Sequence, residues 1–319
     1  MTTIHVPVLL KETLQYLVSR RDGVYVDATL GTGGHFASLS EQLDQNATLI
    51  GIDADPNAIN YCSTHLSIKQ KHILINSNFE SIKAICFRNG YPRINGILMD
   101  LGMSSFALEN PDRGLSYSVN GPLDMRFSPD LPKTASDIIN TANQSELATI
   151  FKTFGEERNS RSIARAIIDE RKINTIKTTG QLAEIIRHKT HPLYVNKTLS
   201  RIFQALRIVV NRELEVLKKA LKDAIDILEP DGRIVIITYH SLEDRIVKQY
   251  FKAESTDCVC PPEFPICQCS HKASIKLLTT KPILPGKDEI RNNSRARSAK
   301  LRAAERIRLE NYDGKGENQ

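Results

Sequence analysis

The sequence predicts an α/β protein built on a doubly wound parallel sheet, with a helical segment inserted between the fourth and fifth strands. Four apolar runs within residues 24–100 alternate with stretches of helical period. Residues 134–229 show helical period only, and an apolar strand pattern resumes at residue 232. Strands and helices that alternate at this spacing form parallel sheets with right-handed crossovers.

The first four strands are expected at the runs "VYVDA", "ATLIGID", "HILIN" and "INGILMD". These runs are apolar almost throughout, as strands covered on both faces are. The helices between them are expected at residues 34–45, 55–68 and 79–89. Asp55-Pro56 marks the start of the second helix, because aspartate caps helices and proline is favoured in the first turn.

The inserted segment is expected to be all-helical. Residues 101–133 are rich in Gly, Pro, Ser and Asp and predict no strand. The helices that follow are expected at "ASDIINT", "QSELATIFKTF", "RNSRSIARAIIDER", "TGQLAEIIRHKT" and one long stretch, "TLSRIFQALRIVVNRELEVLKKALKDAIDILE". Five helices exceed what a crossover needs, so we predict an inserted domain at 111–229 and a sheet domain at 1–110 and 230–319. The alternative is that these helices are the outer layer of a single domain.

The remaining elements are a fifth strand at 232–240, a helix at 244–251 and a further strand at 274–280. The tail at 281–308 carries nine Lys or Arg residues against three Asp or Glu residues. This charge pattern fits either a solvated end segment or an arm that contacts phosphates.

The composition fits a folded protein of one large or two smaller domains, with 319 residues of which 25% are charged. No segment approaches the roughly 18–20 unbroken apolar residues of a membrane span. The start "MTTIHVPVLLKETL" lacks the features of a secretory signal, which predicts a cytoplasmic protein without a disulfide framework. The net charge of +6 is weak support for an anionic partner.

A glycine-rich turn follows the first strand, in "VYVDATLGTGGHF". The first strand-to-helix turn of such a sheet is a ligand site, and Gly31, Gly33 and Gly34 allow a close backbone approach. A nicotinamide site would need G-x-G-x-x-G, but Phe36 stands where the last glycine is expected. Asp27 would direct a negative charge at the turn, which suits the cationic amine of S-adenosylmethionine better than a pyrophosphate.

Further candidate residues stand at successive strand ends. Asp53 ends "LIGID", where an acid can accept hydrogen bonds from both ribose hydroxyls. Phe79 follows the third strand beside Asn78, where a side chain can flank an adenine. Asp100 ends the fourth strand at the switch point of the sheet. Their order along the chain favours S-adenosylmethionine as the cofactor.

Several motifs in order along the chain resemble the bacterial MraW/RsmH family of ribosomal RNA methyltransferases. The resemblance extends from His5 to about Glu305. Its motifs are "HVPVLLKE", "DATLGTGGH", "DLGMSS", "RGLSYSVNGPLDMRF", "FGEERNSRSIARAI", "FQALRIVVNREL", "TYHSLEDRIVK" and "NNSRARSAKLRAAE".

This resemblance implies a Rossmann-like class I methyltransferase that uses S-adenosylmethionine to methylate N4 of a cytidine in 16S ribosomal RNA, near the decoding centre. The family usually has glutamine at the position of Ala107, whose side chain cannot supply a hydrogen bond. The implied cofactor contacts are Gly33, Gly34, His35, Asp53, Phe79, Asp100 and Ala107.

Asp100 and His240 are the predicted catalytic residues. The cytosine amino group is a poor nucleophile, so acceptors must hold its N–H bonds while a proton leaves. His240 lies in "TYHSLEDR", directly after the fifth strand, the expected neighbour of the fourth. A purely structural role for His240 is the alternative. Glu243 and Asp244 are expected to cap the next helix.

The expected partner is 16S ribosomal RNA or the assembling small ribosomal subunit, and a homodimer is left open. The target base must be single-stranded or flipped out. Arg158, Arg161 and Arg165 are expected on one helix face, where they could line an RNA channel. Solvated faces with ion pairs are the alternative. The tail residues expected beside them are Arg291, Arg295, Arg297, Lys300 and Arg302.

Four cysteines in "CVCPPEFPICQCS" are expected to be reduced loop residues without a metal, because C-x-C is less usual than C-x-x-C in zinc sites. Two other functions stay open. A nicotinamide-dependent oxidoreductase would differ in the cofactor it binds. A catalytically silent RNA-binding factor on the same fold would bind the cofactor without transferring a methyl group.

Overall fold

The structure is a computed structural model that describes residues 7–103, 110–261, 263–264 and 266–308. Its internal contacts divide the chain into two compact units. The sheet unit comprises residues 1–53, 59–102 and 218–319, and the helical unit comprises residues 54–58 and 103–217. The sequence predicted 111–229 for the inserted segment.

The sheet unit contains seven strands in the order β3-β2-β1-β4-β5-β7-β6 within the described residues. Neighbours from β3 to β5 pair in parallel, whereas β7 is antiparallel to both β5 and β6. This arrangement confirms the predicted doubly wound, Rossmann-like α/β class. The strands are β1 (Val24–Asp27), β2 (Thr48–Asp53), β3 (Lys71–Asn76), β4 (Ile94–Asp100), β5 (Leu228–Thr238), β6 (Ile275–Leu277) and β7 (Lys300–Arg306).

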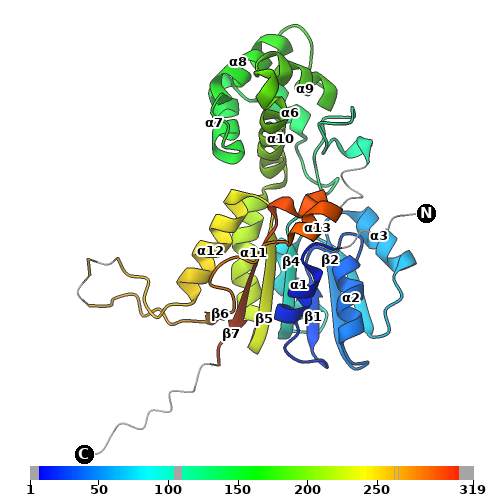
Figure 1. The fold of residues 1–319 in the computed structure, drawn as a ribbon, viewed down its shortest axis with the longest axis vertical. Helices are drawn as coiled ribbons and strands as arrows, with labels where there is room; N and C mark the ends of the chain where they lie inside the picture. The colour runs from blue at the N-terminus through cyan, green and yellow to red at the C-terminus, as the bar shows by residue number, and fades with distance from the viewer. Residues whose placement is uncertain (1–6, 104–109, 262, 265, 309–319) are drawn as a thin grey trace, which may run out of the picture. The chain divides into compact units, whose positions relative to one another are not determined.

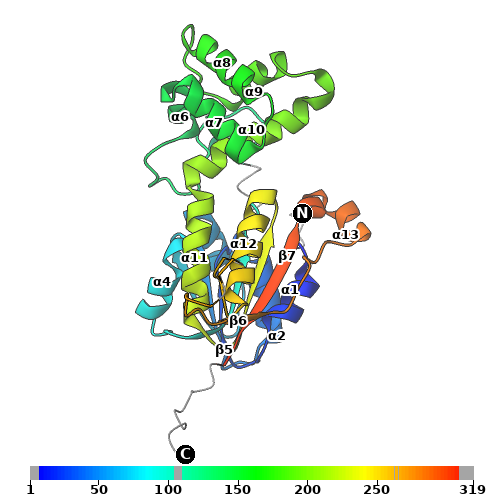
Figure 2. The ribbon, with the colours of Figure 1, turned by 90° about the vertical axis from the view of Figure 1, so that its left-hand side faces the viewer.

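Helices cover both faces of this sheet. Figure 2 shows α1 and α2 on one side of the strands and α4, α11 and α12 on the other. The three crossover helices predicted between the first four strands are confirmed, the last of them as a short 3₁₀ turn followed by α4. The helices are α1 (Leu10–Leu17), α2 (Gly34–Gln42), α3 (Pro56–His65), η1 (Phe79–Ser81), α4 (Ile82–Arg88), α11 (Glu213–Ile227), α12 (Ser241–Glu254) and α13 (Lys287–Asn292).

The sheet buries its strands where helices cover both faces. Five of the six residues of β2 are buried, whereas the edge strand β3 has no buried residue. Tyr25 from β1 and Phe36 from α2 are fully buried in the same core. Each buried aliphatic or aromatic side chain contributes about 1.5–3 kcal/mol, so this core holds the strand ends in place.

The prediction that residues 281–308 form a solvated segment or an RNA-contacting arm is partly wrong, because residues 300–306 form β7 between β5 and β6. Arg302 is only 6% exposed and donates to Asp244 at 2.7 Å, and Lys300 donates to the same carboxylate at 3.2 Å. Leu301 and Ala303 are buried on this strand. Arg302 therefore neutralises a largely buried carboxylate and is not available to RNA phosphates as predicted, whereas the Lys300 side chain keeps 38% of its surface exposed.

The helical unit has a hydrophobic core of its own, to which Phe151, Ile163 and Leu206 contribute fully buried side chains. Capping boxes at Thr134, Asn143 and Thr178 begin three of its helices, since each side chain accepts from the third backbone N–H beyond it. The helices of this unit, among the described residues, are α6 (Ala135–Thr141), α7 (Gln144–Gly155), α8 (Ser160–Arg171), α9 (Thr179–His188) and α10 (Val195–Asn211).

The last long helix of the prediction is broken at Arg212, which has a left-handed φ of 52°. Side-chain contacts fix the break. The Asn211 carboxamide accepts from the backbone N–H of Phe127 at 2.7 Å and donates to the carbonyl oxygen of Met125 at 2.8 Å. Arg207 and Glu213 form a two-bond ion pair across the break, at 2.8 and 2.9 Å. The sequence pattern is helical on both sides, so periodicity alone could not reveal the break.

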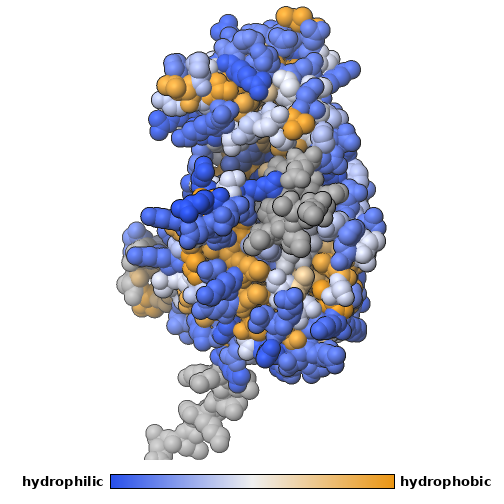
Figure 3. Space-filling model, turned by 45° about the vertical axis from the view of Figure 1, so that its right-hand side comes forward, coloured by the Kyte–Doolittle hydropathy of each residue, from blue (hydrophilic) through white to orange (hydrophobic). Residues whose placement is uncertain are grey.

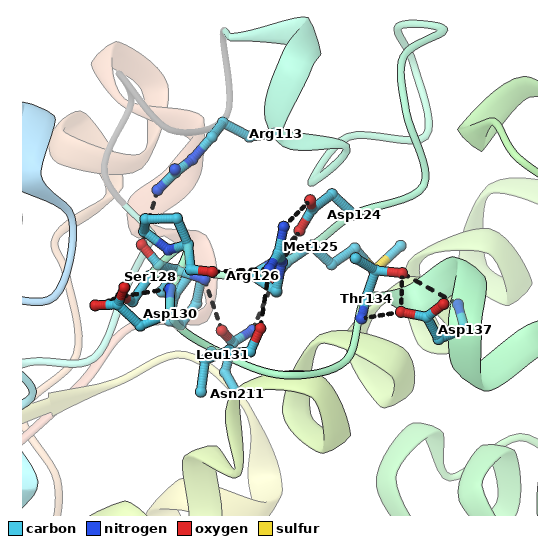
Figure 4. A network of polar contacts seen from close by, with 12 residues as sticks. Arg113, Asp124, Met125, Arg126, Ser128, Asp130, Leu131, Thr134, Asp137 and Asn211 are labelled. Atoms are coloured by element: carbon cyan, nitrogen blue, oxygen red, sulfur yellow. Dashed lines mark hydrogen bonds and ion pairs between the residues drawn. The ribbon is translucent and has the colours of Figure 1, made fainter.

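The segment from 111 to 131 is ordered by polar contacts rather than by regular secondary structure (Figure 4). Arg126 binds both carboxylate oxygens of Asp124 at 2.8 Å and also donates to the carbonyl oxygens of Pro129 and Leu131. A Cβ at Gly121 would lie 2.0 Å from the carbonyl oxygen of Pro111, so this position admits only glycine.

Hydrophilic side chains cover most of the face drawn in Figure 3, with smaller hydrophobic groups between them. None of the helices in the described ranges is long and apolar enough to cross a membrane.

Candidate active site

Three carboxylates converge at the carboxyl edge of the sheet. Asp27 ends β1, Asp53 ends β2 and Asp100 ends β4, and these strands are parallel neighbours. The negative charges of Asp53 and Asp100 both act to raise the pKa of Asp27. Such an edge is the ligand-binding crevice of doubly wound sheets.

The glycine turn lies over this edge. Gly31 and Gly33 have left-handed φ values of 53° and 76°, which glycine adopts without strain. A Cβ at Gly33 would lie 2.5 Å from Cδ1 of Leu66, so the turn has no room for a side chain there. Gly34 begins α2 and lies against Pro7, whose Cγ would be 2.6 Å from an added Cβ. The missing side chains at Gly33 and Gly34 therefore make room for Leu66 and Pro7.

Asp53 connects the glycine turn to β2. One of its carboxylate oxygens accepts from the backbone N–H of Gly31 at 2.7 Å. Asn78 accepts from the N–H of Glu80 at 2.9 Å and so caps the short turn that carries the half-buried Phe79. The structure thus places Asp53 and Phe79 at the ends of neighbouring strands, β2 and β3.

His35 lies beneath the turn and is 7% exposed. Its Nε2 lies 3.1 Å from the carbonyl oxygen of Val8, and burial lowers the pKa of the ring. A carbonyl oxygen can only accept, so Nε2 carries the proton and a neutral ring leaves Nδ1 bare. Nδ1 lies 3.7 Å from Oδ2 of Asp100. His35 therefore lies against the end of β4 without donating a hydrogen bond to Asp100.

Asp100 is held by contacts on several sides. Its backbone N–H donates to the Thr29 hydroxyl at 2.7 Å, and the N–H of Gly102 donates to Oδ1 at 3.3 Å. Burial of the carboxyl group raises the pKa of Asp100, and the nearby Tyr239 side chain acts to lower it. Burial likewise raises the pKa of Tyr239, so this side chain is a neutral neighbour of Asp100.

Tyr239 was not among the predicted site residues. Its position in the motif "TYHSLEDR" could have identified it, because this motif directly follows the fifth strand and the fifth strand lies next to the fourth. A Cβ at Gly102 would lie 2.6 Å from the Tyr239 ring, so the two segments are in contact.

Asp27 is 1% exposed, which disagrees with the expectation that it directs its charge at a ligand above the turn. Its Oδ1 accepts from the backbone N–H of Thr29 at 3.1 Å. Burial raises the pKa of Asp27 from 3.8 to about 7. The folded chain therefore binds a proton at Asp27 that the unfolded chain releases between about pH 4 and 7, and stability falls as pH rises through this window.

The Asp27→Asn variant is expected to be more stable than the parent protein at pH 8, by up to about 4 kcal/mol, because a pKa shift of about three units is removed. The gain should shrink to nearly nothing close to pH 4, where the parent aspartate is protonated in both states. Thermal unfolding without cofactor across this pH range measures the effect. Asp44→Asn, at a 54% exposed side chain, is the control. Parallel pH profiles for all three proteins would contradict the prediction.

His240 is the N-cap of α12. Its Nδ1 accepts from the N–H of Glu243 at 3.4 Å, and the Glu243 carboxylate accepts from the N–H of Tyr239 at 2.9 Å and of His240 at 3.3 Å. The capping role predicted for Glu243 is confirmed. Asp244 instead binds Arg302 and Lys300, so its predicted capping role is wrong. The catalytic role of His240 stays a prediction.

The structure does not place all the other predicted residues as expected. Ala107 lies outside the described residues. Arg158 precedes α8, so only Arg161 and Arg165 share a face of that helix, and both are exposed. Arg291 and Arg297 of the tail are also exposed, and Arg291 lies 3.4 Å from Asp288.

Comparison with known proteins gives a consistent result. The family model described as "MraW methylase family" matches residues 2–307. The chain is 46% identical to "Ribosomal RNA small subunit methyltransferase H" of Carboxydothermus hydrogenoformans, over 95% of this chain and 98% of that protein. It is 46% identical to the protein of the same name from Brevibacillus brevis, over 96% of this chain and all of that protein.

Among solved structures, an rRNA methylase from Streptococcus thermophilus matches with a TM-score of 0.40 and 12% identity, over 94% of each chain. The family match spans the glycine turn, the three strand-end carboxylates and the helical unit alike. With this match and with relatives at 46% identity over nearly the full length, the chain belongs to the MraW methylase family.

Proposed function

We propose that this protein transfers the methyl group of S-adenosylmethionine to N4 of a cytidine in 16S ribosomal RNA, near the decoding centre. The observation that carries the proposal is the family match over residues 2–307, which includes the glycine turn, Asp53 and Asp100 at one sheet edge. The full-length relatives named "Ribosomal RNA small subunit methyltransferase H" support the choice of RNA. Membership of a methylase family excludes the nicotinamide-dependent oxidoreductase alternative.

The residues at the edge fit S-adenosylmethionine. The carboxylates of Asp53 and Asp100 would repel a pyrophosphate, whereas they suit the cationic amine and sulfonium of this cofactor. We assign contacts with the cofactor to Gly33, Gly34 and His35 in the turn, which follows β1 at the carboxyl edge of the sheet. We assign ribose binding to Asp53 and an adenine contact to Phe79. Asp100 and Ala107 complete the proposed set.

The bound cofactor supplies an electrophilic methyl group. The protein must align the acceptor with that methyl group and exclude water. We assign to the Asp100 carboxylate the role of accepting a hydrogen bond from the N4 amino group. The N–H of Gly102 donates to this carboxylate, which orients it. His240 is the second catalytic candidate, but because its Nδ1 accepts from the N–H of Glu243, a neutral ring carries its proton on Nε2 and can only donate there.

The partner is 16S ribosomal RNA or the assembling small subunit. The inserted helical domain is proposed to recognise RNA, supported by the exposed Arg158, Arg161 and Arg165 at α8. Arg165 lies 3.9 Å from Asp169 with both side chains more than half exposed, so that pair is weak and the arginine is available to phosphate. The cytoplasmic location stays a prediction, and the homodimer stays open.

Mass mapping of small-subunit RNA from cells with and without the gene tests the proposal. We expect one cytidine to lose a methyl group without the gene and to regain it with the parent gene. Purified protein with radiolabelled S-adenosylmethionine then distinguishes naked 16S RNA from assembled subunits as the substrate. Identical methylation in both strains would contradict the proposal. Cofactor binding without methyl incorporation would favour the catalytically silent RNA-binding factor.

A further inference from the structure

Four cysteines gather far from the sheet edge, in the segment that connects α12 to β6. This segment extends away from the strands (Figure 1). The Sγ atoms of Cys258, Cys260, Cys267 and Cys269 all lie within 4.8 Å of one another. The Sγ atoms of Cys267 and Cys269 are 3.6 Å apart, and those of Cys269 and Cys258 are 3.9 Å apart. The spacing C-x-C-x6-C-x-C is unusual for a zinc site, and the sequence therefore predicted no metal. In the folded chain, however, this spacing brings all four sulfurs together.

The spacing of the sulfurs matches the coordination shell of a single ion. Zinc binds thiolate at about 2.3 Å in a tetrahedron, so the ligand sulfurs lie about 3.8 Å apart. The distances from Cys269 to Cys267 and to Cys258 fall on either side of this value. All six cysteines of the chain are free thiols, so the cluster is not a pair of disulfides.

The backbone of this segment donates hydrogen bonds to the sulfurs. The N–H of Cys260 lies 3.4 Å from Sγ of Cys258, and the N–H of Gln268 lies 3.3 Å from Sγ of Cys260. The N–H of Val259 lies 3.5 Å from Sγ of Cys269. Hydrogen bonds to a charged group favour its charged form, and such outer contacts typically orient the ligands of a metal.

Apolar burial does not explain why the cysteines converge. Val259 and Phe264 are each 48% exposed and Ile266 is 75% exposed, so the segment has little core of its own. Cys258 and Cys267 are exposed, whereas Cys62 and Cys86 are buried in the usual manner of unreactive cysteines. Some other interaction must hold this segment together.

We propose that Cys258, Cys260, Cys267 and Cys269 bind one zinc ion as thiolates and that this ion fastens the segment between α12 and β6. Four sulfur ligands leave no coordination position for water or substrate, which makes the site structural rather than catalytic. Soft thiolates select zinc over magnesium or calcium. The convergence of all four sulfurs within the shell of a single ion argues against a cluster of several iron atoms.

Metal analysis of the full chain, purified without a polyhistidine tag or chelator, tests the proposal. We expect about one zinc per chain in the parent protein and in the Cys86→Ala control, and less than about a tenth of that in the Cys258→Ser, Cys267→Ser double variant. A parent protein without stoichiometric zinc, a parent protein with iron in its place, or a double variant that keeps its zinc would overturn the proposal.

Cobalt substitution gives a second measurement that does not depend on the stability of the variants. Metal-free parent protein titrated with Co²⁺ should show sulfur-to-cobalt charge-transfer bands and the strong visible bands of tetrahedral cobalt. The bands should saturate at one equivalent and disappear on addition of one equivalent of zinc. Weak octahedral bands, or no bands, would overturn the proposal. Limited proteolysis should cleave residues 256–273 faster in the metal-free protein; equal rates would likewise count against it.

Discussion

The Asp100→Asn variant is expected to lower kcat for methyl transfer by about 10²–10⁴-fold, the usual contribution of a positioned acid–base group. The amide keeps an oxygen for the N–H of Gly102 but cannot carry the charge that accepts from the N4 amino group. The dissociation constant for S-adenosylmethionine should change less than about tenfold. Single-turnover kinetics on the small subunit and calorimetry with the cofactor measure the two quantities separately.

The pH dependence gives an independent check on Asp100. Burial raises the pKa of this carboxyl group, and the ionised form is the acceptor. The rate of methyl transfer should therefore rise with pH as Asp100 ionises. This rise should lie above the pH of about 4 at which an exposed aspartate titrates. Asp100→Asn should lack this rise. A variant with the parental kcat and the parental rise would contradict the assignment.

Matched variants separate Asp100 from its neighbours. Asp44→Asn removes an exposed carboxylate and should leave kcat unchanged. His240→Asn keeps a good capping side chain at the start of α12, so a loss of kcat in that variant would reveal a role beyond the helix cap. We expect that loss to be smaller than the loss in Asp100→Asn, because Nδ1 of His240 is engaged by the N–H of Glu243.

The parallel strands and the site at their ends could be predicted because both follow from short-range pattern. Four apolar runs with helical stretches between them specify a doubly wound sheet, and its geometry brings the ends of β1, β2 and β4 to one edge. Asp53 and Asp100 were therefore identifiable from position alone. The proximity of Tyr239 to Asp100 was not, because it depends on side-chain orientation.

β7 could not be recognised because its sequence, "KLRAAER", looks like a solvated segment. It becomes a strand through contacts with distant residues. Arg302 reaches Asp244, and Glu305 accepts from Arg233 at 2.9 Å and from Lys276 at 2.6 Å. The charged residues of a strand between β5 and β6 are thus neutralised by partners that a local pattern cannot reveal.

The Asp53→Ala variant is expected to weaken S-adenosylmethionine binding by about 10²–10⁴-fold. In the proposed complex this carboxylate accepts two ribose hydroxyl hydrogen bonds, and each hydrogen bond to a charged group contributes about 1.5–3 kcal/mol. It also holds the glycine turn through the N–H of Gly31 at 2.7 Å. Calorimetric titration with S-adenosylmethionine and with its demethylated product measures the loss.

Asp53→Asn separates the two roles of this side chain. The amide keeps one oxygen, which can still accept from the N–H of Gly31, but it loses the charge and one ribose acceptor. We therefore expect an intermediate weakening of about tenfold, with the turn preserved. If Asp53 served only the turn, Asp53→Asn would bind the cofactor as the parent protein does, and only Asp53→Ala would lose affinity. Unchanged affinity in both variants would place the ribose elsewhere and would remove Asp53 from the binding site altogether.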